Sequence, residues 1–161
     1  MLTWYKKIYS THMHRYLTVL DYISVVVTAV IFAFGVFLRI REGIIHGVRF
    51  VLVAAVPFVI VSCARFFINS MRPYEVYDFL EFTDKNPGKK SGKSFPSRHV
   101  FSSFLIAGLA FSFSPVLGIV GLIAGGVLAF CRVSLGIHFI KDVVFGAIIG
   151  AFSAIIGLLI I

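Results

Sequence analysis

Long runs of residues without a charged side chain constrain this chain more than any other feature. Tyr22–Leu38 and Phe50–Ala64 are two such runs, and Val100–Phe113, Pro115–Cys131 and Val143–Ile161 follow them. A helix needs about 20 mostly apolar residues to cross a bilayer, and these runs approach that length. Backbone amides in lipid have no water to bind, so they are satisfied within helices. The pattern therefore predicts five membrane-spanning helices.

The composition supports this interpretation. Of the 161 residues, 59% are hydrophobic and 14% are charged, and the mean hydropathy is +0.98. Soluble domains carry about 25% charged residues. We therefore expect an all-α, integral-membrane helical bundle that forms one domain over residues 1–161. The expected segments are an interfacial segment at 1–16, spans at 17–38, 48–69, 97–113, 115–131 and 138–161, and a long polar loop at 70–96.

The third run is short for a membrane span. Val100–Phe113 has 14 residues, about 21 Å as a helix against a hydrocarbon core of about 30 Å. The helix is therefore expected to begin earlier, at Ser97. This start places His99 in the first turn, close to the lipid boundary.

The chain has a formal net charge of +8, but its cations lie next to the apolar runs instead of covering a soluble surface. This distribution argues against a nucleic-acid-binding protein. Four arginines lie at span ends or just beyond them, where an unpaired charge is costly and needs an anionic partner. For any single arginine, an ion pair with a nearby acid or contact with lipid headgroups is a sufficient explanation. These residues are Arg65, Arg72, Arg98 and Arg132.

The spacing of the polar residues indicates more than isolated ion pairs. Arg65 and Arg72 are seven residues apart, so both leave one helix face if the second span stays helical to its end, where Pro73 breaks it. His138 and Asp142 are four apart, so they stack if the fifth helix extends back to His138. The carboxylate would then accept an imidazole N–H, fix the tautomer and make the other ring nitrogen a better nucleophile or metal ligand.

Alternate loops of a helical bundle lie on one side of the membrane. With five spans, the loop after the second span, the start of the third and the loop after the fourth share a side, so the arginines and both histidines can meet there. Ser97 and the free N–H groups of the third helix's first turn would add an anion site. Arginines around a helix N-terminus describe a phosphate pocket, in which His99 and His138 supply a proton donor and a nucleophile.

Three segments resemble, in order, the signature motifs of the type 2 phosphatidic acid phosphatase superfamily, the lipid-phosphatase relatives of vanadium haloperoxidases. They are RFFINSMRP (Arg65–Pro73), PSRH (Pro96–His99) and CRVSLGIHFIKD (Cys131–Asp142). The family motifs read K-x6-R-P, P-S-G-H and S-R-x5-H-x3-D. Each motif alone is weak, whereas the three in order are specific.

The chain departs from the family pattern at three motif positions. Arg65 stands in place of Lys. This substitution keeps the positive charge but replaces a compact ammonium group with a planar guanidinium that donates from several N–H groups. Arg98 replaces the Gly of P-S-G-H, and Cys131 replaces a Ser. The family commonly has six spans with the first motif after the third, whereas this chain is expected to have five, with that motif after the second. None of these departures removes the nucleophile, the acid or the orienting carboxylate.

The resemblance implies a reaction through a phosphohistidine, with no metal or other cofactor. His138 would attack phosphorus, Asp142 would orient its ring, and His99 would protonate the leaving oxygen and later activate water. The groups implied in binding the phosphoryl oxygens are Arg65, Arg72, Ser97, Arg98 and Arg132, with the backbone N–H groups of residues 97–99.

A site at the lipid boundary favours a phosphate or diphosphate carried by a membrane lipid. Phosphatidic acid, phosphatidylglycerol phosphate and undecaprenyl diphosphate are the expected types, in a bacterial plasma membrane. A lipid phosphotransferase with the same site and a non-catalytic lipid-binding or transport protein are the alternatives. The sequence leaves the oligomeric state open. Four lysines of the 70–96 loop either contact a second phosphate or anionic headgroups, or belong to a solvated loop: Lys85, Lys89, Lys90 and Lys93.

Two indications of the orientation in the membrane contradict each other. Twelve of the 15 Lys and Arg residues fall on the side of the expected site, and three (Arg39, Arg41 and Arg49) fall on the other. The positive-inside rule therefore predicts a cytoplasmic site. The resemblance implies an extracytoplasmic site, as is usual for the bacterial family.

Overall fold

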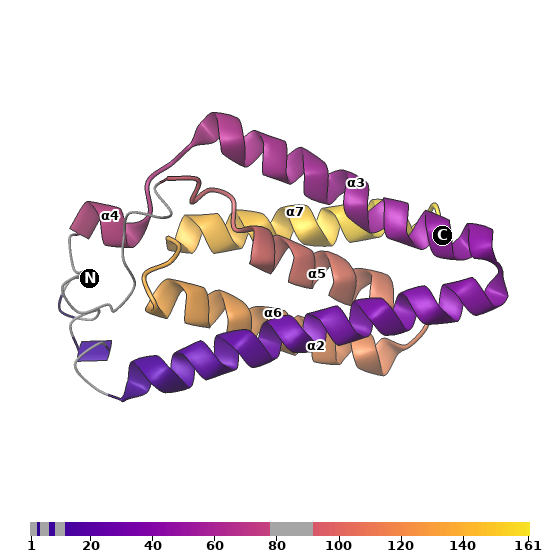
Figure 1. Ribbon diagram of the computed structural model, residues 1–161, viewed down its shortest axis with the longest axis horizontal. Coiled ribbons are helices and arrows are strands. Elements are labelled where there is room, and N and C mark those ends of the chain that lie inside the picture. The colour runs from indigo at the N-terminus through magenta and orange to yellow at the C-terminus, as the bar shows by residue number, and fades with distance from the viewer. Residues whose placement is uncertain (1–2, 4–6, 9–11, 78–91) are drawn as a thin grey trace.

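The computed structural model describes residues 3, 7–8, 12–77 and 92–161, and within these residues the chain is helical without strands. Most of the expected 1–16 segment, and Lys85, Lys89 and Lys90, lie outside the described residues. Figure 1 shows the helices running roughly along one axis. They are α2 (Met13–Glu42), α3 (Ile44–Ile68), α4 (Pro73–Tyr77), α5 (Arg98–Ala110), α6 (Pro115–Ser134) and α7 (Ile140–Leu158).

Among the described residues, four helical stretches are long and apolar enough to cross a membrane: α2, α3 with α4, α6 and α7. Their outer faces carry large apolar side chains, and Val30, Ile60 and Phe152 are each at least 60% exposed. Continuous apolar surface of this kind suits contact with lipid. These features confirm the all-α helical membrane bundle.

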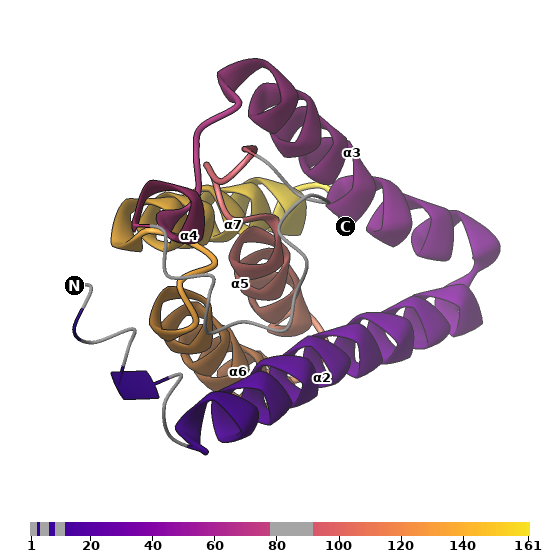
Figure 2. The ribbon, with the colours of Figure 1, turned by 60° about the vertical axis from the view of Figure 1, so that its left-hand side comes forward.

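α5 lies at the centre of the bundle, packed against α2, α3, α6 and α7 (Figure 2). Val100 and Phe101 in its first turn have no exposed surface. Glycines allow α7 to approach closely, because a Cβ atom at Gly146 would lie only 2.7 Å from the carbonyl oxygen of Ser97, and Gly150 faces the Phe101 carbonyl. Small residues of α7 therefore hold the N-terminal half of α5 in place.

α5 is shorter than the expected span at 97–113. Ser97 is its N-cap, the helix has 13 residues, and Phe111–Phe113 form a turn before α6. Because the surrounding helices cover α5, its ends need not match the thickness of the lipid. Figure 1 shows α5 beginning deeper in the bundle than the adjacent ends of α2 and α6.

The end of α3 corrects one expectation. The helix ends at Ile68, and Asn69 follows in the left-handed conformation (φ 42°), which Asn tolerates better than most residues. Pro73 therefore does not break α3; it is the first residue of α4, where a missing N–H costs nothing. The expectation that Arg65 and Arg72 leave one helix face is wrong, because only Arg65 is helical.

The start of α7 corrects a second expectation. The helix begins at Ile140, because Phe139 has an extended backbone and is the N-cap, and Asp142 accepts the Phe139 N–H at 3.0 Å. His138 lies in the link between α6 and α7, where Gly136 has a φ of 63° that favours glycine. His138 and Asp142 therefore do not stack on one helix, although they still meet.

Candidate active site

Residues 92–97 lead into α5, and their backbone is bonded to the segment that follows α3. The Ser94 N–H donates to the Ser70 carbonyl, and the Phe95 N–H donates to the Ser70 hydroxyl, each at 2.9 Å. Non-helical backbone inside a membrane bundle needs such partners, since no water is available. These bonds fix the path of the chain into the N-terminus of α5.

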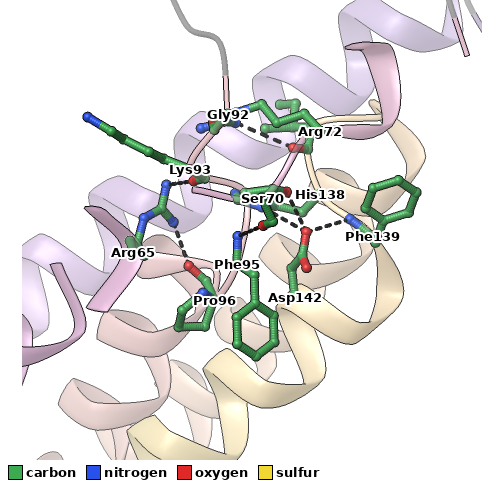
Figure 3. Close-up of polar contacts among 12 residues, drawn as sticks. Arg65, Ser70, Arg72, Gly92, Lys93, Phe95, Pro96, His138, Phe139 and Asp142 are labelled. Atoms are coloured by element: carbon green, nitrogen blue, oxygen red, sulfur yellow. Dashed lines mark hydrogen bonds and ion pairs between the residues drawn. The ribbon is translucent and has the colours of Figure 1, made fainter. Parts of the chain in front are cut away.

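Arg65 braces the same segment from the end of α3. Its side chain is buried, with 5% exposed, and donates to the carbonyl oxygens of Pro96 (2.5 Å) and Lys93 (Figure 3). A guanidinium has five N–H donors, so further hydrogens remain available to an anion. Arg65 is therefore both a structural brace and a fixed positive charge.

Arg72 links two parts of the site. Its Nε donates to the Gly92 carbonyl at 3.1 Å, and its Nη1 lies 3.4 Å from the carbonyl of Ile137, the residue before His138. The Glu75 carboxylate accepts the backbone N–H of Arg72 at 2.7 Å and that of Gly92 at 2.8 Å. The polar segment after α3 thus holds Arg72 beside the α6–α7 link.

His138 and Asp142 form a buried pair. His138 is 2% exposed and Asp142 is fully buried, and the distance from His138 Nδ1 to Asp142 Oδ2 is 3.6 Å. The Ser94 hydroxyl, also fully buried, donates to Asp142 Oδ2 and lies 3.3 Å from His138 Nδ1. Because both acceptors face Nδ1, they favour the tautomer with the proton on Nδ1. The Nε2 lone pair is then free to react.

Burial lowers the pKa of His138 below its usual value of 6.5. The hydrogen bond and the charge of Asp142 act in the opposite direction and raise the pKa, while the charges of Arg72 and Arg65 lower it. The effects of burial and of the arginines are the larger ones, so the pKa of His138 is lowered overall. His138 is therefore neutral near pH 7, as a nucleophilic imidazole must be.

The N-terminus of α5 lies next to this pair. The Ser97 N–H donates to the Asp142 carbonyl at 2.9 Å, which ties the N-cap to α7. The Ser97 hydroxyl does not cap the helix; it is buried and has no hydrogen-bond partner among the described residues. A buried hydroxyl without a partner costs free energy unless a ligand satisfies it. With the free N–H groups of the first turn, it is suited to an anion.

Arg132 at the end of α6 pairs with Asp21 on α2, with its Nε 2.7 Å from Asp21 Oδ1. Both side chains are at most 15% exposed, so the pair is largely desolvated. The Arg132 carbonyl accepts the His138 N–H at 3.2 Å, which holds the α6–α7 link. Arg132 also interacts electrostatically with Arg72 and His99.

His99 and Arg98 face a different part of the bundle from Asp142. Both line a cavity of about 350 Å³ whose other walls are mostly apolar. Arg98 Nη1 lies 3.5 Å from the Ser62 hydroxyl of α3, and its guanidinium lies over the Phe58 ring. His99 interacts electrostatically with Arg132 and with the His138 ring. His99 therefore belongs to the cavity lining and lies within electrostatic range of His138.

The structure places Arg65, Arg72, Ser97, His138 and Asp142 at the end of the bundle where α5 and α7 begin, whereas the Arg98 guanidinium lies toward α3 and the cavity. Two further contributors, Ser94 and Asp21, were not expected from the sequence. Ser94 lies two residues before the PSRH motif, and Asp21 is the one charge that interrupts the first apolar stretch. A lone acid at membrane depth is a signal that could have been used, because it needs a cationic partner.

Comparison with known proteins supports the resemblance. A search of solved structures found the crystal structure of LpxE from Aquifex aeolicus, with a TM-score of 0.58 and 23% identity, over 91% of this chain and 93% of that one. This likeness concerns the fold. No curated protein matches the chain. The family description that matches residues 46–161 is that of the PAP2 superfamily, and the match takes in all three motifs. The chain belongs to the PAP2 superfamily.

Proposed function

We propose that this protein is a lipid phosphatase that acts through a phosphohistidine on His138, without a metal ion. The observation that carries the proposal is the buried pair of His138 and Asp142, with Nδ1 3.6 Å from Oδ2, beside the N-terminus of α5. Membership of the PAP2 superfamily supports the reaction class.

In the first step, the Nε2 lone pair of His138 attacks phosphorus, and an N–P bond forms. The bond from phosphorus to the lipid oxygen breaks, and its electron pair stays on that oxygen. Protonated His99 gives the oxygen its proton, so that a lipid alcohol leaves. Asp142 and Ser94 hold the Nδ1 proton and stabilise the positive ring that develops.

In the second step, a water molecule attacks the phosphohistidine. His99, now neutral, takes a proton from the water, and the N–P bond breaks with its electron pair returning to Nε2. Inorganic phosphate is released, and both histidines regain their starting states. One group thus serves first as acid and then as base.

The arginines supply the positive charge that phosphoryl transfer requires. Arg65, Arg72 and Arg132 are each fixed by a carbonyl or carboxylate partner, and Ser97 with the first-turn N–H groups of α5 adds uncharged donors. Donors fixed in advance need no reorganisation as charge develops. This set fills the role that a metal ion plays in other phosphatases.

Phosphate release by the purified protein in detergent tests the proposal. The substrates are phosphatidic acid, phosphatidylglycerol phosphate and an isoprenoid diphosphate, each with and without an acceptor lipid alcohol. His138→Ala should reduce release to background, and the control His46→Ala, at an exposed histidine on α3, should not. Equal release by parent and His138→Ala would contradict the proposal. Phosphorylated acceptor in place of inorganic phosphate would identify a phosphotransferase.

We place the active-site end on the extracytoplasmic side of a bacterial plasma membrane, as the family resemblance implies. Cations that serve the substrate account for part of the charge excess at that end. Cysteines introduced at Lys93, which is exposed at this end, and at Glu42, which is 51% exposed at the other, test the placement in a Cys63→Ser background. An impermeant maleimide should label intact cells only at position 93. Labelling only at position 42 would reverse the orientation.

A further inference from the structure

The cavity beside His99 is mostly apolar, and it shares His99 and Arg98 with the candidate site residues. Val25 and Ala29 of α2, Phe58 of α3, and Ile106 of α5 form walls, and His99 and Arg98 lie on its lining. The proposed acid, His99, must stand at the leaving oxygen. The lipid that carries that oxygen therefore extends into this cavity, whose apolar walls match its chain.

Arg98 is the charged group on this lining. No carboxylate of the described residues lies within 4.0 Å of it, in contrast to Arg132, which has Asp21. Its polar contact is the Ser62 hydroxyl at 3.5 Å, the limit of a hydrogen bond, and its other contact is the Phe58 ring. A cation that is half-buried among apolar groups is costly unless an anion joins it.

The position of Arg98 selects among leaving groups. In phosphatidic acid the leaving group is an uncharged alcohol. In a lipid diphosphate the leaving oxygen is bonded directly to a second phosphorus, so the leaving group carries its negative charge next to the oxygen that His99 protonates. Arg98 and His99 are consecutive residues lining one cavity. A cation beside the acid therefore matches a diphosphate.

We propose that Arg98 binds the inner phosphate of a lipid diphosphate, and that this protein prefers lipid diphosphates to lipid monophosphates. The inference rests on the proposed function. His138 would take the terminal phosphoryl group, the bridging oxygen would keep the electron pair and receive the proton of His99, and Arg98 would hold the lipid monophosphate that leaves. An Arg in place of the motif's Gly is then a specificity determinant of this chain.

A matched pair of substrates tests the inference. Diacylglycerol diphosphate and phosphatidic acid with the same acyl chains differ only in the second phosphate. The ratio of their kcat/KM values should favour the diphosphate in the parent protein by about tenfold or more, the size expected for a hydrogen bond between charged groups. Arg98→Ala should lower the ratio about tenfold or more, and Arg98→Lys, which keeps the charge but has no planar, two-pronged donor group, should lower it less.

Arg15→Ala is the control, because Arg15 is an exposed cation in the first turn of α2, at the same end, and has no assigned role in binding. It should leave the ratio unchanged. A parent ratio near one, equal losses on both substrates in Arg98→Ala, or a ratio that depends on Arg15 would each overturn the inference. The parent ratio needs no variant, so the test survives a variant that fails to fold. A failure of the proposed function itself would be recognised separately, because His138→Ala would then release as much phosphate as the parent protein.

Discussion

Ser94 donates a hydrogen bond from its buried hydroxyl to the Asp142 carboxylate, while its oxygen lies 3.3 Å from His138 Nδ1. The distance from Nδ1 to the carboxylate itself is longer, at 3.6 Å. Ser94 is therefore an intermediary between the acid and the imidazole. It is a positioning residue that acts through His138 and Asp142.

Ser94→Ala is expected to lower kcat about 10- to 100-fold with little change in KM, because the loss of one hydrogen bond to a charged group costs about 1.5–3 kcal/mol. Phosphate release at saturating substrate measures the effect. Ser103→Ala is the matched control: Ser103 is also fully buried, and its hydroxyl bonds to Thr28 of α2 at 2.9 Å instead of to His138 or Asp142. Equal losses of kcat in the two variants would mean that Ser94 has only a structural role.

The pH dependence should report the ionisation of His138. Burial lowers the pKa of His138 below 6.5, so the ring stays neutral as the pH falls to that value, and kcat should fall only at lower pH. Asp142 raises this pKa, so Asp142→Asn should move the acid limb of the kcat profile to still lower pH while reducing kcat. Profiles of both proteins on one substrate test this. An acid limb that moves upward in Asp142→Asn would contradict the assignment.

His99→Ala should distinguish an acid from a binding residue. A general acid contributes about 10²- to 10⁴-fold when the leaving group is poor, and far less when it needs no proton. We expect a large loss of kcat on an alkyl phosphate and a small loss on an aryl phosphate with an activated phenolate. Single-turnover rates on the two substrates measure this difference. Equal losses on both would assign His99 to binding.

Asp21→Asn should weaken the site through Arg132. Breaking a buried ion pair leaves an uncompensated charge and costs about 3–5 kcal/mol, so the variant should lose thermal stability. It should also raise KM, because Arg132 loses the contact that orients it. Glu42→Gln removes the partner of Arg39 at the far end, where Glu42 is 51% exposed, and is the control. Exposed ion pairs contribute about 0–1 kcal/mol to stability. An equal loss of thermal stability in Glu42→Gln and Asp21→Asn would therefore refute the role of Asp21.

The helices were predictable from the sequence because lipid leaves the backbone no other solution. Their ends were not, since each end depends on one local cap. Asn69 stops α3 before Arg72 through its left-handed backbone, and Asp142 accepts the Phe139 N–H and so starts α7 after His138. Neither contact has a periodic signal in the sequence.

The candidate site was predictable to the extent that its residues stand at motif spacings. Ser94 was missed because the role of a hydroxyl depends on what it faces, and it faces Asp142 from a distant segment. Asp21 was missed because its partner lies on α6, far along the chain. Arg98 was placed in the phosphate pocket, whereas its guanidinium lies toward α3 and the cavity, which is information that only the fold contains.

Vanadate should inhibit the enzyme competitively and more tightly than phosphate, because it adopts the five-coordinate geometry through which phosphorus passes. In that complex His138 Nε2 would close the apical bond, and the basicity of this nitrogen depends on Asp142 at 3.6 Å from Nδ1. Asp142→Asn should therefore weaken vanadate inhibition together with turnover, whereas a double change of Lys89 and Lys90 should alter only lipid preference. Inhibition constants for the three proteins, measured in EDTA, test both points. A strict need for a divalent metal, or equal vanadate inhibition in Asp142→Asn and the parent, would place the chemistry outside this pocket.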